Sequence, residues 1–100
     1  MDTYGRLMIG PVDPDAYGLV WHQVARMLLA GIADGTYPPG TRLPSENDIA
    51  QAAGVARLTA RRAFTWLTEQ GIAQAFPGRG TFVRPVLPDP LPMPPDGRPL

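Results

Sequence analysis

The chain has 100 residues, 44% of them hydrophobic, and this length accommodates one small domain with a modest core. It contains no cysteine and one histidine, so disulfide bonds, thiolate chemistry and the usual zinc-ligand spacings are excluded. No apolar run reaches the roughly eighteen residues that span a bilayer, and acidic Asp2 stands where a signal peptide is basic. We therefore expect a cytoplasmic protein with no membrane contact.

The formal net charge of zero hides an uneven distribution of charge along the chain. From Arg42 to Arg84, six arginines stand against three acidic residues, a local balance of +3, and the parts on either side are acidic. All nine basic residues are arginine, which suits bidentate contacts to phosphate and guanine, although a GC-rich genome explains the absence of lysine better. The basic middle of the chain is compatible with a nucleic-acid partner.

Residues 1–13 show no sustained periodicity and are expected to form a flexible arm. Asp13 can cap a helix whose first turn contains Pro14, and apolar residues then recur at a spacing close to four. This pattern predicts a first helix over residues 15–34, with His22 on its surface, ended by Gly35 and the prolines that follow.

A capping pattern predicts a second helix that begins at Ser45. Ser45 can accept from amides of the next turn, Asp48 can reach back, and Gly54 ends the helix after about two turns. A tight connection then leads to a third helix over residues 56–70, closed by Gly71. Two short helices joined by a glycine-containing turn are typical of a helix-turn-helix.

Two short extended runs, residues 72–76 and 81–83, follow the third helix and predict a β-hairpin with a basic tip. A helix-turn-helix followed by such a hairpin is a winged helix. From Pro85 onward seven of sixteen residues are proline, which predicts an extended or disordered tail. The expected fold is α+β, with three helices and a C-terminal β-hairpin wing in residues 14–84, between the arm and the tail of residues 85–100.

The third helix carries the main candidate functional residues. A rotation of about 100° per residue gives an inward stripe of Ala60, Ala63, Phe64 and Leu67, and an exposed surface that includes Arg57, Leu58, Arg61, Arg62 and Thr65. A recognition helix reads bases chiefly through its N-terminal residues, and arginine paired with guanine is the commonest specific contact. Taken alone, these arginines fit a solvated charged face better; the adjacent wing favours DNA contact.

Three further positions extend the candidate surface. Arg79, between two glycines, suits a minor-groove or phosphate contact, and a turn made polar for solubility explains it equally well. Arg42 and the helix N-terminus at Ser45 suit phosphate, although Ser45 is first a helix cap. Trp66 lies outside both the inward stripe and the arginine surface, and it can pack on the first helix, stack on the tail or enter a subunit interface.

From about Val20 to Val83 the chain resembles the DNA-binding domain of the GntR family of bacterial transcription regulators. Three ordered blocks carry the resemblance: Gly35-Thr36-Tyr37 with Pro39-Gly40-Thr41-Arg42-Leu43-Pro44-Ser45-Glu46; Gly54-Val55-Ala56-Arg57-Leu58-Thr59-Ala60-Arg61-Arg62-Ala63-Phe64; and Glu69-Gln70-Gly71-Ile72 with Gly78-Arg79-Gly80-Thr81-Phe82-Val83. The resemblance implies an operator-binding winged helix, usually dimeric on a palindrome. Positions that the family uses at DNA are matched by Arg42, Arg57, Thr59, Arg61 and Gly78.

The chain departs from the family pattern in two places. Ala56 stands where the family has serine, which removes a helix cap and a phosphate donor and implies weaker binding. The family pattern also continues into a ligand-binding and dimerising domain, whereas a proline-rich segment follows here, so no small-molecule effector is expected.

The leading hypothesis is a sequence-specific DNA-binding transcription regulator that represses by occupying a double-stranded operator. It would need no catalytic residue, metal or cofactor. The resemblance to the family implies a homodimer. The candidate DNA-binding set is Arg42, Ser45, Glu46, Arg57, Leu58, Thr59, Arg61, Arg62, Gly78, Arg79 and Gly80. A second hypothesis is a winged-helix protein-interaction module that uses Trp66 and the tail and does not need Arg57 or Arg61. An enzyme has almost no support, since there is no cysteine, no lysine and no Walker-type phosphate loop.

Overall fold

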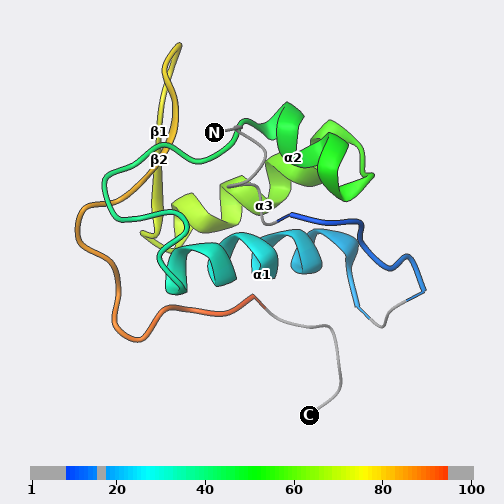
Figure 1. Cartoon of the computed structure of the whole chain (residues 1–100), viewed down its shortest axis with the longest axis horizontal. Helices are drawn as coiled ribbons and strands as arrows, with labels where there is room; N and C mark the ends of the chain where they lie inside the picture. The colour runs from blue at the N-terminus through cyan, green and yellow to red at the C-terminus, as the bar shows by residue number, and fades with distance from the viewer. Residues whose placement is uncertain (1–8, 16–17, 95–100) are drawn as a thin grey trace.

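The computed structural model describes residues 9–15 and 18–94 and contains three helices followed by a two-stranded antiparallel hairpin. The elements in chain order are α1 (Val20–Ala33), α2 (Glu46–Ala53), α3 (Arg57–Glu69), β1 (Ala73–Phe76) and β2 (Gly80–Val83). α3 lies at the centre and packs against α1, α2 and β1, while the hairpin projects from one end of the helices (Figure 1). The predicted three-helix and wing architecture is confirmed. No helix in the described part of the chain is long and apolar enough to cross a membrane.

The boundaries of α2 follow the local signals in the sequence. The Ser45 hydroxyl accepts a hydrogen bond from the Asp48 N–H at 3.0 Å and caps the helix. Gly54 takes the left-handed conformation, with φ of 72°, and donates its N–H to the Ala50 carbonyl at 2.9 Å. The chain then turns through residues 54–56 into α3. The inward stripe predicted for α3 is confirmed, because all four of its residues are buried.

The predicted start of α1 is wrong. Leu19 is extended, with φ of −85° and ψ of 143°, and serves as the N-cap of a helix that begins only at Val20. The Asp13 carboxylate accepts from the Asp15 N–H at 2.9 Å, so it closes a tight local turn instead of capping a helix. Residues 16 and 17, which the predicted helix also included, lie outside the described residues.

His22 is buried, with 4% of its surface exposed, and the expectation of a surface residue is also wrong. It precedes Ala25 by three residues and Leu29 by seven, and both of these are buried. Because residues three, four and seven apart share one face of a helix, His22 turns inward with them.

The core forms where the three helices, the loop after α1 and the hairpin meet. Its largest fully buried side chains are Val24, Leu28, Tyr37, Ile49, Leu67, Ile72 and Val83. Tyr37 donates its N–H to the Gly31 carbonyl at 2.9 Å, and a Cβ at Gly31 would overlap the Tyr37 ring. A glycine inside α1 therefore lets the following loop pack directly on the helix.

The hairpin is a wing with a third strand-like segment along its base. β1 and β2 pair in register from Ala73 opposite Val83 to Phe76 opposite Gly80. Residues 40–43 run beside β2: the Leu43 N–H donates to the Thr81 carbonyl at 2.8 Å, and the Val83 N–H donates to the Thr41 carbonyl at 2.8 Å. The segment that leads into α2 is thus hydrogen-bonded to the wing.

Both flanking segments contact the domain over their described parts. Ile9 is buried, and the Val12 N–H donates to the Ala53 carbonyl at 3.1 Å. After Val83 the chain runs back along α1 (Figure 1), with Leu87 and Leu91 packed against the core. The sequence led us to expect a flexible arm and an extended or disordered tail, and residues 9–13 and 84–94 contain no helix or strand. Isolated apolar side chains in both segments bury against the core without needing regular secondary structure, which composition alone does not reveal.

Candidate nucleic-acid interface

α3 presents an exposed arginine surface at its N-terminal half. Arg57, Leu58, Arg61 and Arg62 are all exposed, and Leu58 leaves 72% of its surface open to solvent. Thr59 is half-buried beside them. Since α1, α2 and β1 hold the opposite stripe of the helix, these side chains remain free of the core. Their position is the one the sequence predicted.

Arg61 is held by an acidic residue of α2. Its Nε lies 3.2 Å from Oε1 of Glu46, and the two side chains are 55% and 27% exposed. The contact uses one nitrogen, and neither terminal guanidinium nitrogen of Arg61 has a hydrogen bond to another described residue. Glu46, which the sequence placed in the binding set, therefore contacts Arg61 through Nε and leaves its two terminal nitrogens available.

Arg62 turns toward α1. Its guanidinium carbon lies 5.4 Å from the centre of the Trp21 ring, a cation–π distance. The rings of Trp21 and Trp66 lie 6.5 Å apart, centre to centre, and both residues pack against the core. Of the three alternatives for Trp66, the structure shows packing on the first helix. The Arg62 contact was missed because it depends on the crossing of α1 and α3, which no local pattern encodes.

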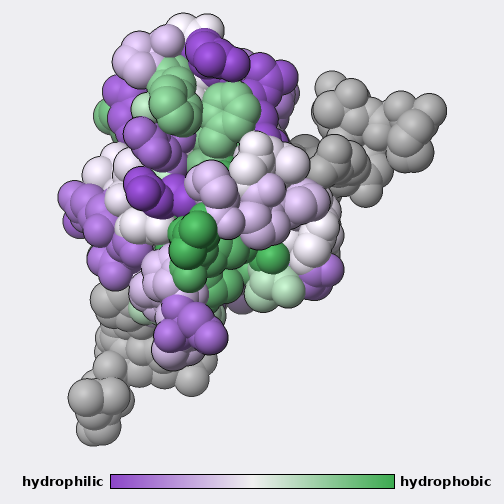
Figure 2. All heavy atoms as spheres, turned by 90° about the vertical axis from the view of Figure 1, so that its left-hand side faces the viewer, coloured by the Kyte–Doolittle hydropathy of each residue, from purple (hydrophilic) through white to green (hydrophobic). Residues whose placement is uncertain are grey.

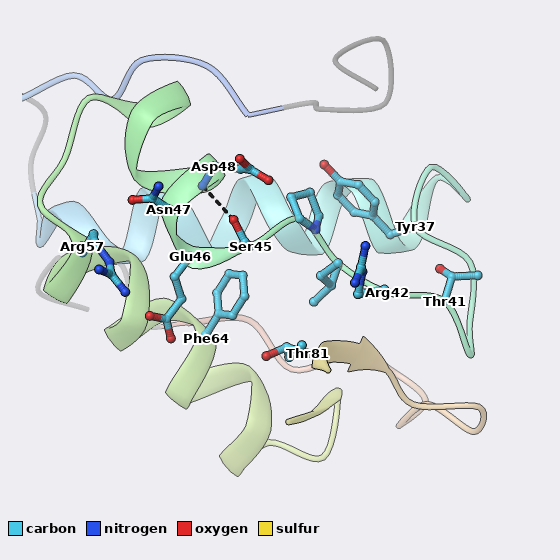
Figure 3. Close-up of a pocket in the computed structure, with 13 residues that line it drawn as sticks. Tyr37, Thr41, Arg42, Ser45, Glu46, Asn47, Asp48, Arg57, Phe64 and Thr81 are labelled. Carbon is cyan, nitrogen blue, oxygen red and sulfur yellow. Dashed lines mark hydrogen bonds between the residues drawn. The ribbon is translucent and has the colours of Figure 1, made fainter. Parts of the chain in front are cut away.

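An open groove of about 740 Å³ separates the start of α2 from β2. Figure 3 shows Arg57 near one end of the groove and Arg42 near the other, with Ser45 and Thr81 on facing sides. The backbone N–H groups at the start of α2 point along the positive end of its dipole, where anions are favoured. The groove thus combines two arginines and a helix N-terminus with the acidic residues Glu46 and Asp48, which also line it.

The wing supplies a second basic element. Arg79 is exposed at its tip, where the Arg79 N–H donates to the Phe76 carbonyl at 2.9 Å. Gly78 has φ of 77° after Pro77, as in a type II turn. Figure 2, which faces the left-hand side of Figure 1, shows hydrophilic groups around apolar ones at the upper end, where the wing lies.

The groove brings five residues of the predicted set together, Arg42, Ser45, Glu46, Arg57 and Gly80, whereas Leu58, Thr59 and Arg62 lie beside Trp21 of α1. The described residues include no group of three or more His, Cys, Asp or Glu side chains that could hold a metal ion. The available chemistry is that of guanidinium groups, hydroxyls and backbone amides, which together suit a polyanion.

Three helices with a hydrogen-bonded wing define a winged helix-turn-helix domain. Residues 21–83 match the family model described as "Bacterial regulatory proteins, gntR family". The chain therefore belongs to the GntR family of bacterial regulatory proteins, and its fold is the DNA-binding domain of that family.

Among curated proteins, the chain is 35% identical over 72 residues to the probable fructoselysine utilization operon transcriptional repressor of Escherichia coli, and 36% identical over 64 residues to the transcriptional repressor NagR of Bacillus subtilis. These matches cover 72% and 64% of this chain. They cover 30% and 26% of the relatives, so the chain spans less than a third of their length.

Solved structures with a similar fold include DNA-binding transcription regulators. The DNA-binding domain of AraR in complex with operator ORX1 is 32% identical, with a TM-score of 0.67 over 75% of this chain and 95% of that one. A GntR family transcriptional regulator from Listeria monocytogenes is 26% identical, with a TM-score of 0.69 over 74% of this chain and 63% of that one.

Proposed function

We propose that this chain binds operator DNA and regulates transcription, as a repressor that occupies a promoter. The observation that carries the proposal is the exposed arginine surface of α3 beside a basic wing, on a fold whose solved neighbours include complexes with operator DNA. α3 would enter the major groove, and the wing would lie along the neighbouring backbone or minor groove. No step of this function needs a catalytic residue or a cofactor, and it takes place in the cytoplasm.

Within this proposal Arg57 and Arg61 read base edges through their terminal nitrogens. Leu58 supplies an apolar contact of the kind that thymine methyl groups accept, and Thr59 supplies a hydroxyl donor. Glu46 acts through Arg61 instead of touching DNA, since a carboxylate next to phosphate is repelled.

Other members of the set are assigned to contacts with the DNA backbone. Ser45 and the first amides of α2 would bind a backbone phosphate at the groove, and Arg79 would bind phosphate or the minor groove from the wing. Gly78 and Gly80 let the wing backbone approach the duplex. Arg62 would contribute charge from beside Trp21.

Palindromic operators and two-fold protein symmetry go together, because each protomer then reads one half-site. We propose a homodimer on DNA for this chain. Light scattering coupled to size-exclusion chromatography, with and without operator, tests this: a 1:1 complex on a palindrome would contradict it.

The function is tested by fluorescence anisotropy on fragments from the region upstream of the protein's own coding sequence, at physiological salt, against random duplex of equal length. We expect preference for at least one fragment. Arg61→Ala should weaken binding to that fragment by roughly 1–3 kcal/mol, the range for a bidentate base contact. Arg26→Ala on α1 is the matched control and should bind like the unmodified chain. Equal affinity for every duplex would contradict the proposal.

The protein-interaction alternative is not favoured. Trp66, which it needed as an exposed contact, is engaged with Trp21 and the core. The described part of the tail packs along α1, where Leu87 and Leu91 are already in contact with the core.

A further inference from the structure

Arg42 lies in the segment between α1 and α2 that is hydrogen-bonded to β2, and its side chain reaches toward the wing tip. Its backbone forms an isolated antiparallel bridge with Phe82 of β2. The residues on either side are fixed by the hydrogen bonds between residues 40–43 and β2, and Leu43, which follows, is buried. The backbone of Arg42, from which the side chain extends, is therefore held in place relative to β2.

The Arg42 side chain occupies space that a side chain on Gly80 would fill. Gly80 is two residues before Phe82 on β2, so the two share one face of the wing. A Cβ built on Gly80 would lie 2.9 Å from Cδ of Arg42 and 3.5 Å from its Cγ. The aliphatic stem of Arg42 thus lies directly against the backbone of Gly80.

The guanidinium end of Arg42 reaches the wing tip. Its Nη1 donates to the carbonyl oxygen of Arg79, with 3.4 Å between the two atoms. Neither Arg42 nor Arg79 has an ion pair with a carboxylate among the described residues. One end of Arg42 is fixed to the entry of α2, and the other holds the peptide that carries the Arg79 side chain.

We infer that Arg42 is a positioning residue: it braces the wing tip through Gly80 and the Arg79 carbonyl, and so directs the Arg79 side chain toward DNA. The part of the inference that concerns DNA, the direction of the Arg79 side chain, rests on the proposed function. The contacts of Arg42 with Gly80 and Arg79 belong to the free protein and do not depend on it. Position 80 favours glycine for two reasons, its φ of 116° and the close approach of the Arg42 stem. The sequence had suggested instead that Arg42 binds a phosphate independently.

The brace is tested first without DNA, by the amide resonances of residues 78–81 in a heteronuclear NMR spectrum. Arg42→Ala should shift the Arg79 and Gly80 amides. Arg84→Ala is the matched control, because Arg84 is exposed at the end of the same hairpin and donates to the Gln74 side chain at 3.4 Å. Unchanged amides at positions 79 and 80 in Arg42→Ala would overturn the inference, whatever the chain does with DNA.

The role at DNA is tested by a double-mutant cycle on the preferred fragment. Arg79→Ala should weaken binding about tenfold, as for one charged hydrogen bond. Arg42→Ala should cost a similar factor alone and almost nothing when added to Arg79→Ala. In the Arg79→Ala background, Arg42→Ala should also leave the slope of log affinity against log salt unchanged. Additive losses, or a slope that falls by about 1, would show an independent phosphate contact and overturn the inference.

Substitution at the glycines gives a second comparison. Gly78→Ala and Gly80→Ala both place a Cβ at positive φ, 77° and 116°, but only the Cβ at position 80 meets Arg42. Gly80→Ala should therefore shift the Arg42 side-chain resonances and Gly78→Ala should not. Equal effects of the two substitutions on Arg42 would contradict the brace. If the unmodified chain shows no operator preference, the proposed function is contradicted. The brace is not affected by that result, because the amide shifts test it without DNA.

Discussion

The two helices of the helix-turn-helix begin in opposite ways. α2 starts with the Ser45 hydroxyl as acceptor for the Asp48 N–H and has Glu46 and Asp48 in its first turn, so the protein itself places an acceptor and negative charge at that end. α3 starts at Ala56 with no side-chain cap and no acidic residue in its first turn, and its first helical residue is Arg57. A cation at a helix N-terminus is unfavourable for the free helix. The contrast indicates that the start of α2 is stabilised by side chains of the protein itself, whereas the start of α3 has no such support among the described residues.

The largest expected effect comes from removing the cation at the start of α3. Arg57→Ala should weaken operator binding by roughly 1–3 kcal/mol, while the midpoint of thermal unfolding stays unchanged or rises slightly because the cation no longer opposes the dipole. Anisotropy and thermal unfolding on the same samples separate the two effects. A large fall in stability would show that Arg57 supports the fold, and the contrast between the helices would then be lost.

Removing the cap of α2 should act on stability instead. Ser45→Ala should lower the free energy of unfolding by about 1 kcal/mol, because the Asp48 N–H loses its acceptor. Urea unfolding followed by circular dichroism measures the change. Ser45→Asp retains a capping oxygen and should stay close to the unmodified chain. If Ser45→Ala unfolds at the same urea concentration, the serine is not the stabilising cap described above.

Restoring a cap to α3 sharpens the comparison. Ala56→Ser should raise the free energy of unfolding by about 0.5–1 kcal/mol and tighten operator binding, because the new hydroxyl can accept from the helix and donate to phosphate. Ala30→Ser, the same change at an exposed position inside α1, should lower stability by a few tenths of a kcal/mol. A stabilising effect of equal size at both positions would exclude capping as its cause.

The smallest effect is expected for the ion pair between the two helices. Glu46→Gln should lower the free energy of unfolding by about 0.5 kcal/mol or less at low salt, since the pair is partly exposed, and the difference should vanish at high salt. Thermal unfolding at two ionic strengths measures it. A loss above about 2 kcal/mol would mean that Glu46 holds α2 against α3 by more than this pair.

Local signals made the helix-turn-helix predictable. The serine cap, the left-handed glycine and the inward stripe of α3 each depend on residues within one or two turns of one another, so the sequence specifies them directly. The exposed arginine surface followed from the same helical geometry. The start of α1 was mispredicted because Asp13 can serve a turn as well as a helix cap, and only the backbone at Leu19 distinguishes the two.

Contacts between distant segments were not predictable. The pairing of Glu46 with Arg61, the position of Arg62 over Trp21 and the reach of Arg42 to Arg79 join residues 15 to 41 positions apart in the chain. Each depends on how whole elements cross, and side chains of the same type at these positions fit several crossings equally well. The packing of residues 9–13 and 84–94 belongs to the same class.

The turn at the wing tip has a thermodynamic consequence for any complex it enters. Proline at position 77 fixes φ, and the bond from the Arg79 N–H to the Phe76 carbonyl closes the loop before a ligand arrives. The turn therefore loses conformational entropy during folding. Ordering of the tip on association then costs less conformational entropy than ordering of a flexible loop would.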